Sequence, residues 1–262
     1  ACSAASGPFR ASTVTYDAAL QTYALTQTNP LAQTVSTGYD YALAAPTTVT
    51  DLNGNVTTTA YDGLGRATGI TYPGYGQPNV KYMYPALVGG VVAAPFKLEM
   101  QAWDETATPA IYRSAWTIYD GLGRALQVQG PAETSGQLIL ADTKYDAMGQ
   151  TLYSGLPRQI TGTGGTYYAP TWTSVPHTTS AYDALGRLVT TTVADNTTAT
   201  LSYNGLQTSL IDQNGHKKLQ EVDAFGRLVK VEEYTGTDSM TSLYATTDYG
   251  YDERDLLKTV TD

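Results

Sequence analysis

A six-residue motif recurs through the 262-residue chain and constrains its fold more than any other feature. Full copies with the pattern Tyr-Asp-x-Leu-Gly-Arg occupy residues 61–66, 119–124 and 182–187, and near copies occupy residues 145–150 and 222–227. An aspartate side chain can hydrogen-bond the backbone of a turn, and glycine adopts the positive φ that many tight turns require. The motif therefore predicts that a strand ends at the tyrosine, that aspartate and glycine form a turn, and that the return strand opens at the arginine. The motif residues assigned this structural role are Tyr61, Asp62, Gly65, Arg66, Tyr119, Asp120, Gly123, Arg124, Tyr145, Asp146, Gly149, Tyr182, Asp183, Gly186, Arg187, Asp223, Gly226 and Arg227.

A second turn element stands ten residues before two of these copies. Residues 51–55 (Asp-Leu-Asn-Gly-Asn) precede Tyr61, and residues 212–216 (Asp-Gln-Asn-Gly-His) precede Val222. Asn-Gly pairs are typical of type I′ hairpin turns, so we expect such turns at the opposite end of the same strands. Apolar and polar residues alternate between the turns, as in strands with one wetted face. The sequence thus predicts an all-β fold made of an antiparallel hairpin-repeat sheet.

The repeats divide the chain into a weak and a strong region. Residues 1–44 carry only eroded copies of the motif, whereas residues 45–262 form a nearly continuous array. Alternation over residues 96–119 predicts an inserted hairpin, which accounts for the longest step between clear copies. Glycine and proline predict long loops over residues 72–78 and 160–176, and the second of these is expected to be flexible.

Composition excludes several classes of function. The net charge is -9, so the chain lacks the basic surface with which nucleic-acid-binding proteins neutralise phosphates. One cysteine and two histidines support neither an internal disulfide nor a zinc site, and we expect no metal or other cofactor. The longest apolar stretch, residues 86–96, is interrupted by glycine and proline and is shorter than the roughly 20 residues of a membrane span. No membrane span is therefore expected in this segment.

The motif copies resemble those of the YD-repeat family, also called rearrangement hot spot (Rhs) repeats, which pair a DxxGN-like turn with YDxxGR. Members include Tc-type toxin components, Rhs polymorphic toxins and teneurins. The resemblance implies a spiralling strip that forms part of a hollow shell in a secreted or cell-surface bacterial protein. It further implies that the chain is a fragment of a longer array, with neighbouring repeats of the same chain and an encapsulated toxin segment as partners.

The repeated charged residues allow a catalytic or an anion-binding interpretation besides the structural one. Asp62, Asp120 and the other motif aspartates recur in every unit, which a turn requires and a single active site does not. Each motif arginine follows an aspartate four positions earlier, so ion pairing is favoured over a row of free guanidinium groups. We therefore expect a structural protein and no enzyme.

An adhesin or carbohydrate-binding module is the alternative from another functional class. The chain contains 21 tyrosines, and Trp103, Trp116 and Trp172 are candidates for stacking on surface glycans. The structural interpretation of the same residues is that Trp103 and Trp116 pack across the inserted hairpin and that Trp172 tethers the second long loop. His177 and His216 are expected to be solvated loop residues.

Overall fold

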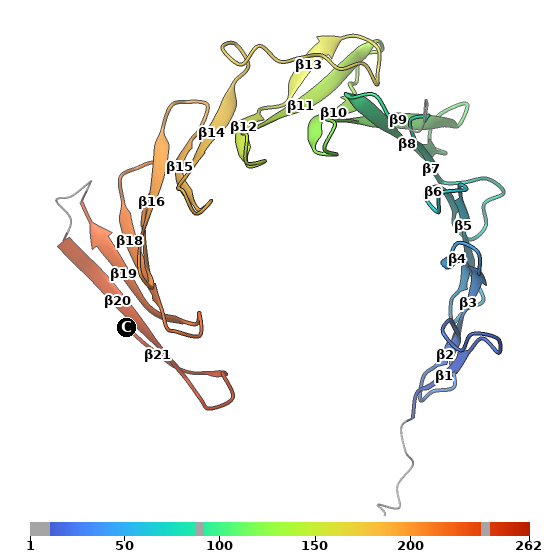
Figure 1. Ribbon diagram of the computed structural model, residues 1–262, viewed down its shortest axis with the longest axis horizontal. Helices are drawn as coiled ribbons and strands as arrows, with labels where there is room; N and C mark the ends of the chain where they lie inside the picture. Colours follow the sequence, from blue (N-terminus) through green and yellow to red (C-terminus); the bar gives the residue numbers. More distant parts are fainter. Residues whose placement is uncertain (1–10, 87–91, 237–241) are drawn as a thin grey trace, which may run out of the picture. The chain divides into compact units, whose positions relative to one another are not determined.

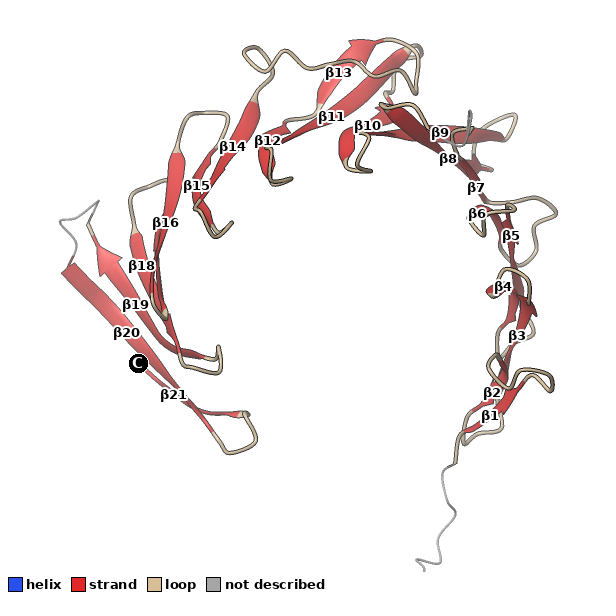
Figure 2. Cartoon of the chain, in the orientation of Figure 1, coloured by secondary structure: helices blue, strands red, loops and turns tan. Residues whose placement is uncertain are grey.

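The computed structural model describes residues 11–86, 92–236 and 242–262, and within them all regular secondary structure is β-strand (Figures 1 and 2). The chain forms two compact units, one of residues 1–124, 129–138 and 161–166 and one of residues 125–128, 139–160 and 167–262. None of the described residues belongs to a helix that is long and apolar enough to cross a membrane. The prediction of an all-β antiparallel hairpin-repeat sheet is confirmed. Part of the apolar stretch at 86–96 lies outside the described residues.

The first nine strands lie in the first unit, and each pairs antiparallel with the next. They are β1 (Thr13–Tyr16), β2 (Ala24–Thr28), β3 (Thr34–Asp40), β4 (Ala45–Thr50), β5 (Val56–Tyr61), β6 (Ala67–Thr71), β7 (Val80–Met83), β8 (Phe96–Asp104) and β9 (Ile111–Tyr119). The hairpin predicted near residues 96–119 is β8–β9, in which Phe96 lies opposite Tyr119. The predicted loop at 72–78 connects β6 to β7.

The remaining strands follow in chain order. They are β10 (Ala125–Pro131), β11 (Gln137–Tyr145), β12 (Thr151–Gly155), β13 (Arg158–Thr161), β14 (His177–Tyr182), β15 (Leu188–Thr192), β16 (Thr198–Asn204), β17 (Gln207–Ile211), β18 (Lys217–Val222), β19 (Leu228–Thr235), β20 (Ser242–Tyr251) and β21 (Leu257–Thr261). In the second unit β11 pairs with β12, β12 pairs directly with β14, and every strand from β14 to β20 pairs antiparallel with its successor.

Antiparallel succession places alternate turns at opposite ends of the strands. In the second unit the motif turns join β11 to β12, β14 to β15, β18 to β19 and β20 to β21, and the two-residue turn between β16 and β17 lies at the same end. We call these five turns the corner tips of the second unit. Figure 1 shows four of them as loops along one edge of this unit's strands. The turns at 193–197 and 212–216 lie at the opposite end.

The opposite-end turns have the same backbone geometry as the motif turns, so the type I′ prediction is wrong. In the turn at 51–55 the Gly54 amide donates to the Asp51 carbonyl and the Asp51 amide to the Asn55 carbonyl. Gly54 has a φ of 83°, but Asn53 is not in the left-handed region, whereas a type I′ turn needs positive φ at both central residues. The observed turn is a type I turn followed by one left-handed residue and a bulge, because a third loop residue separates the strands.

The largest fully buried side chains among the described residues lie on β9, β10 and β11. Ile118, Leu138 and Gln129 are buried in the first unit, and Leu140 with Gln127 is buried in the second. The alternation of buried positions along β10 and β11 shows one covered sheet face there. Elsewhere most strand residues are only half-buried, as the mixture of threonine and tyrosine predicts.

Candidate functional site at the hairpin corners

Each motif aspartate that is followed by an arginine four positions later organises its own turn with both carboxylate oxygens. In the corner at 182–187 the Asp183 Oδ1 accepts from the amides of Leu185 and Arg187, both at 2.9 Å. The Arg187 Nε donates to the Asp183 Oδ2 at 2.7 Å. Gly186 occupies the left-handed region with a φ of 80°. The motif glycines Gly65, Gly123, Gly149 and Gly226 share this conformation, as the turn prediction requires.

The predicted ion pair is present in all four corners that carry an arginine. Each arginine lies 2.7 Å from the aspartate four positions earlier; the pairs are Asp62–Arg66, Asp120–Arg124, Asp183–Arg187 and Asp223–Arg227. The near copy at Asp146 has Gln150 at this position and keeps only the backbone contacts.

The corner contacts favour the ionised form of the aspartates. The Arg66 side chain, followed by the Arg66 and Leu64 amides, lowers the pKa of Asp62 below its ordinary value, although partial burial opposes this. At Asp183 the backbone amide of Arg187 lowers the pKa most, and its guanidinium adds to the effect. Carboxylates held in the charged form by fixed donors are suited to building turns, while a general acid needs a raised pKa.

The motif tyrosines connect neighbouring hairpins through their hydroxyl groups. The Tyr203 hydroxyl donates to the Leu188 carbonyl at 2.8 Å, and the Tyr251 hydroxyl to the Leu228 carbonyl at 2.8 Å. Both acceptors are the first residues of the return strand that follows the preceding motif turn. The same bond joins Tyr145 to Ala125, Tyr182 to Thr151 and, displaced by one residue along the strand, Tyr61 to Pro46. Each of these hydroxyl bonds therefore joins a motif tyrosine to the hairpin that precedes it.

The motif arginines also contact the next aromatic ring. The guanidinium carbon of Arg187 lies 4.2 Å from the centre of the Tyr203 ring, and that of Arg66 lies 4.2 Å from the Tyr84 ring. The Arg227 guanidinium lies 4.8 Å from the Tyr251 ring. An aspartate, an arginine and the following tyrosine thus form a linked series that passes from one hairpin to the next. Because these guanidinium groups already have two partners, the geometry favours the structural interpretation over an anion-binding row.

The three tryptophans are half-buried and occupy separate environments. Trp103 packs on Tyr112 across the β8–β9 hairpin, with ring centres 4.9 Å apart. Trp116, on the same hairpin, lies against Gly164, where an added Cβ would come within 2.2 Å of the indole ring. Trp172 contacts Tyr153 and His177 at 5.1 and 5.3 Å, so it does tether the long loop.

The segment 162–176, which we call the strap, is bound to the sheet rather than being the free loop that its glycines predict. In the first unit the Gln129 side chain donates to the Thr166 carbonyl at 2.6 Å and accepts from the Gly165 amide at 2.7 Å. In the second unit the Gln127 side chain makes the corresponding pair of bonds to the Tyr168 carbonyl and amide. Each glutamine side chain therefore pairs with the strap as a neighbouring strand would.

A buried ion pair completes the attachment in the second unit. The fully buried Asp142 accepts from Arg158 Nε at 2.7 Å and from the Gln127 amide, and Arg158 also donates to the Tyr168 carbonyl. Sequence reasoning missed Gln127, Gln129, Asp142 and Arg158. The one feature of the sequence that could have indicated this attachment is the pair of glutamines two positions apart on one strand. This spacing places both side-chain amides on the same face of the sheet.

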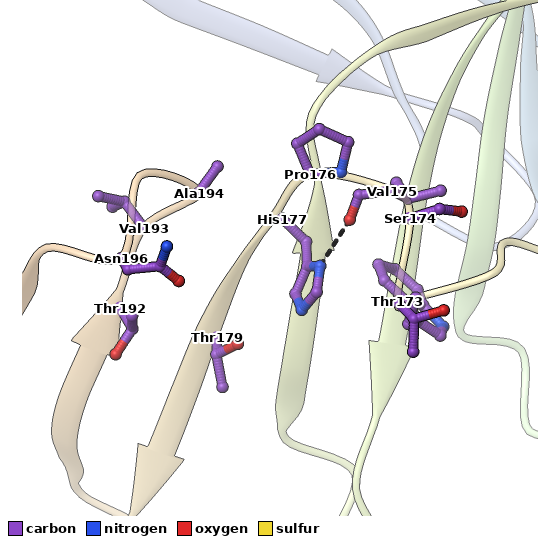
Figure 3. Close-up of a pocket in the computed structure, with 11 residues that line it drawn as sticks. Thr173, Ser174, Val175, Pro176, His177, Thr179, Thr192, Val193, Ala194 and Asn196 are labelled. Atoms are coloured by element: carbon purple, nitrogen blue, oxygen red, sulfur yellow. Dashed lines mark hydrogen bonds between the residues drawn. The ribbon is translucent and has the colours of Figure 1, made fainter.

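A shallow pocket of about 260 Å³ lies where the strap returns to the sheet (Figure 3). It is lined by His177 and Thr179 of β14, by residues 172–176 and by the turn that contains Asn196. The His177 Nδ1 lies 2.7 Å from the Val175 carbonyl. His177 is thus a half-buried residue packed on Tyr153 at 4.6 Å, which corrects the prediction of a solvated imidazole. His216 is exposed and lies 3.2 Å from Asp212.

The fold, but not the sequence, has clear counterparts among known proteins. The sequence matches no protein-family model and no curated protein. The structure is similar to the crystal structure of TcdB2-TccC3, with a TM-score of 0.78 and 17% identity over 96% of this chain. It is also similar to TcdB2-TccC3 without its hypervariable C-terminal region and to the Tc holotoxin pore of Photorhabdus luminescens, both with a TM-score of 0.76 and 14% identity, over 95% and 96% of this chain.

This chain spans only a small part of those proteins. It covers 15% of the chain in TcdB2-TccC3, 17% in the form without the hypervariable region and 18% in the holotoxin pore. The similarity shows that the hairpin-repeat sheet has the fold of part of a Tc toxin component. Among the described residues, groups of His, Cys, Asp or Glu that could hold a metal ion are absent.

Proposed function

We propose that this chain is a non-enzymatic wall segment of a YD-repeat shell that encloses or scaffolds a toxin-like polypeptide in a secreted or cell-surface bacterial protein. The observation that carries the proposal is the linked series of aspartate, arginine and tyrosine at successive corners. Its contacts join each hairpin to the next, with Asp183 paired to Arg187, Arg187 beside the Tyr203 ring and Tyr203 bonded to the Leu188 carbonyl. Such contacts stiffen a continuous sheet in the way that nearest-neighbour interfaces stabilise repeat proteins.

The arrangement of the carboxylates also supports a wall more than an active site. Asp183 and Asp223 lie at corner tips four strands apart, which corresponds to about 19 Å at the spacing of β-strands. Carboxylates that share one reaction lie much closer together. The similarity to TcdB2-TccC3 over 96% of the chain is consistent with the same role.

Protease protection in the complete gene product that carries this chain tests the proposal. We expect trypsin to leave an enclosed polypeptide uncut in the unmodified protein. In the double variant Tyr203→Ala with Tyr251→Ala the hairpin contacts are loosened, and trypsin should cut that polypeptide. Tyr244→Ala is the matched control, because the Tyr244 side chain is 74% exposed. Cleavage that is equal in all three proteins, read by mass spectrometry of the peptides, would contradict enclosure.

A carbohydrate-binding role remains the second candidate because one tryptophan borders a pocket. Trp172 lines the pocket of Figure 3 together with Thr179 and Asn196, whose side chains can bond sugar hydroxyls. Saturable binding on a glycan array that is lost in Trp172→Ala but kept in Trp103→Ala would favour this role. Trp103 is the control because it packs in the β8–β9 hairpin.

A further inference from the structure

The corner tips of the second unit carry a row of exposed apolar side chains. Met148, Leu185 and Phe225 occupy the third position of their turns and are 84%, 78% and 83% exposed. Leu206, in the β16–β17 turn at the same end of the strands, is 51% exposed. We call these four residues the apolar rim. These side chains differ from singly scattered surface apolar residues, because they lie in one row at the same end of the strands.

The turns themselves do not require an apolar residue at this position. The opposite-end turn at 212–216 has the same hydrogen bonds as the motif turns, with Asp212 Oδ1 accepting from Asn214 and His216. There the third position is Asn214. The opposite-end turn at 193–197 likewise exposes Ala194, Asp195 and Asn196 rather than a large apolar residue. Since identical turns accept polar residues, the apolar rim is not explained by turn formation.

The rim has a regular pitch. Successive corner tips are two strands apart throughout the pairing from β11 to β19, so rim residues recur about every 10 Å. A polypeptide in the extended polyproline II conformation advances about 3.1 Å per residue with three residues per turn, so its every third side chain lies on one face and recurs about every 9 Å, close to the spacing of the rim residues. The pitch suits an extended partner that lies along the tips.

The charges around the rim favour a positively charged partner. The five corner tips of the second unit carry six acidic side chains and three arginines, and the whole chain has a net charge of -9. A second copy of this chain would bring the same excess of negative charge to the rim. A partner with lysine or arginine between its apolar residues would be attracted instead.

From these observations we infer that the apolar rim of Met148, Leu185, Leu206 and Phe225 binds an extended, cationic polypeptide segment that carries an apolar side chain at about every third position. This inference rests on the proposed wall function, because it assigns residues and a partner chemistry to the enclosed polypeptide. The rim residues act as separate contact points, and the acidic corners provide complementary charge between them.

Fluorescence anisotropy with the intact chain tests the inference. The probe is a labelled 15-residue peptide with leucine at every third position and lysine and threonine between. We expect saturable binding that weakens about tenfold or more in the triple variant Met148→Ser, Leu185→Ser, Phe225→Ser. The matched control is Leu156→Ser with Leu243→Ser, since these leucines are also exposed in the second unit, at 48% and 55%, but lie away from the corner tips. The control should bind like the unmodified chain.

Two further peptides test separately whether binding depends on the spacing of the leucines and on the positive charge. A peptide of the same composition with the leucines clustered, and one with glutamate in place of lysine, should each bind about tenfold more weakly. Equal binding by the rim and control variants, or by the spaced and clustered peptides, would overturn the inference. So would a rim-dependent dimer of the chain in sedimentation, because the rim would then bind a second copy. Any of these results, alongside retained protease protection in the complete gene product, would remove the rim assignment but not the wall function.

Discussion

At the scale of the residue, the left-handed position of each turn restricts the choice of amino acid more than any other position of the turn. Glycine fills it in the five motif copies with glycine at the fifth position, whereas Ala32, Asn196 and, in the β20–β21 turn, Asp255 fill it in other turns with φ values of 59°, 70° and 62°. Residues other than glycine pay a steric penalty in this region, and asparagine and aspartate tolerate it best. The motif glycine is therefore the part of the sequence signal that is tied most directly to backbone geometry.

Replacing a motif glycine should destabilise its unit. Gly186→Val places a β-branched residue at a φ of 80°, and its Cβ would approach the Gln150 amide to 3.0 Å. We expect a loss of about 1 to 3 kcal/mol in the free energy of unfolding, measured by urea denaturation. Gly63→Val is the matched control, because Gly63 lies in a motif turn outside the left-handed region and has open space around its Cβ position. Equal stability of Gly186→Val and the unmodified chain would remove the turn assignment.

The tyrosine hydroxyl bond should have a measurable effect of its own. Tyr203→Phe removes the donor to the Leu188 carbonyl but keeps the ring beside Arg187. The expected loss is about 1 kcal/mol in the free energy of unfolding, because a net hydrogen bond of this kind contributes about that much. Tyr244→Phe should leave the stability unchanged, since that side chain is 74% exposed. A similar small effect in both variants would mean that the hydroxyl bond does not stabilise the hairpin contact.

At the scale of the element, the motif predicted the hairpins but not the strap. The Tyr-Asp-x-x-Gly-Arg pattern is local, so its turn, ion pair and positive φ follow from six consecutive residues. The strap contacts join Gln129 to Thr166 and Gln127 to Tyr168, which are far apart in sequence and leave no periodic trace. The sequence also did not reveal that the apolar residues at the corners are exposed. A leucine within a motif is usually assigned to the core until its position in the turn is known.

Removing one glutamine should release part of the strap. Gln129→Leu replaces a fully buried side chain and leaves the Thr166 carbonyl and the Gly165 amide without their side-chain partner. We expect a loss of about 2 to 4 kcal/mol in the free energy of unfolding and faster hydrogen exchange at the Gly165 amide. The control Gln213→Leu changes an exposed turn residue and should alter neither quantity. Unchanged exchange at Gly165 in Gln129→Leu would show that the strap is held by other contacts.

At the scale of the whole molecule, the many turn aspartates predict a common response to acid. Hydrogen bonds from Thr106 and Arg113 lower the pKa of Asp104 from 3.8 to about 2, and corner contacts lower the pKa of Asp62 and Asp183. A group with a lowered folded-state pKa contributes stability above its unfolded pKa and loses it as the pH falls through the folded value. The chain should therefore keep its stability down to about pH 4 and lose it progressively toward pH 2.

Thermal unfolding between pH 6 and pH 2 checks this response. Asp104→Asn should flatten the decline in melting temperature below pH 4, because one of the carboxylates that must be protonated is absent. Glu253→Gln is the control, since Glu253 is an exposed residue of the β20–β21 turn. A melting temperature that rises as the pH falls below 4 would contradict the predicted sign.

The direct pairing of β12 with β14 has a consequence for how such a chain can change in length. In an up-and-down sheet, one added strand would reverse the direction of every later strand. Every later motif turn would then lie at the opposite end of the strands. Strands can therefore be gained or lost freely only in pairs, that is, as whole hairpins. The short strand β13 is an odd insertion, and because β12 bypasses it to reach β14, the Tyr-Asp turns beyond it stay in phase with those before.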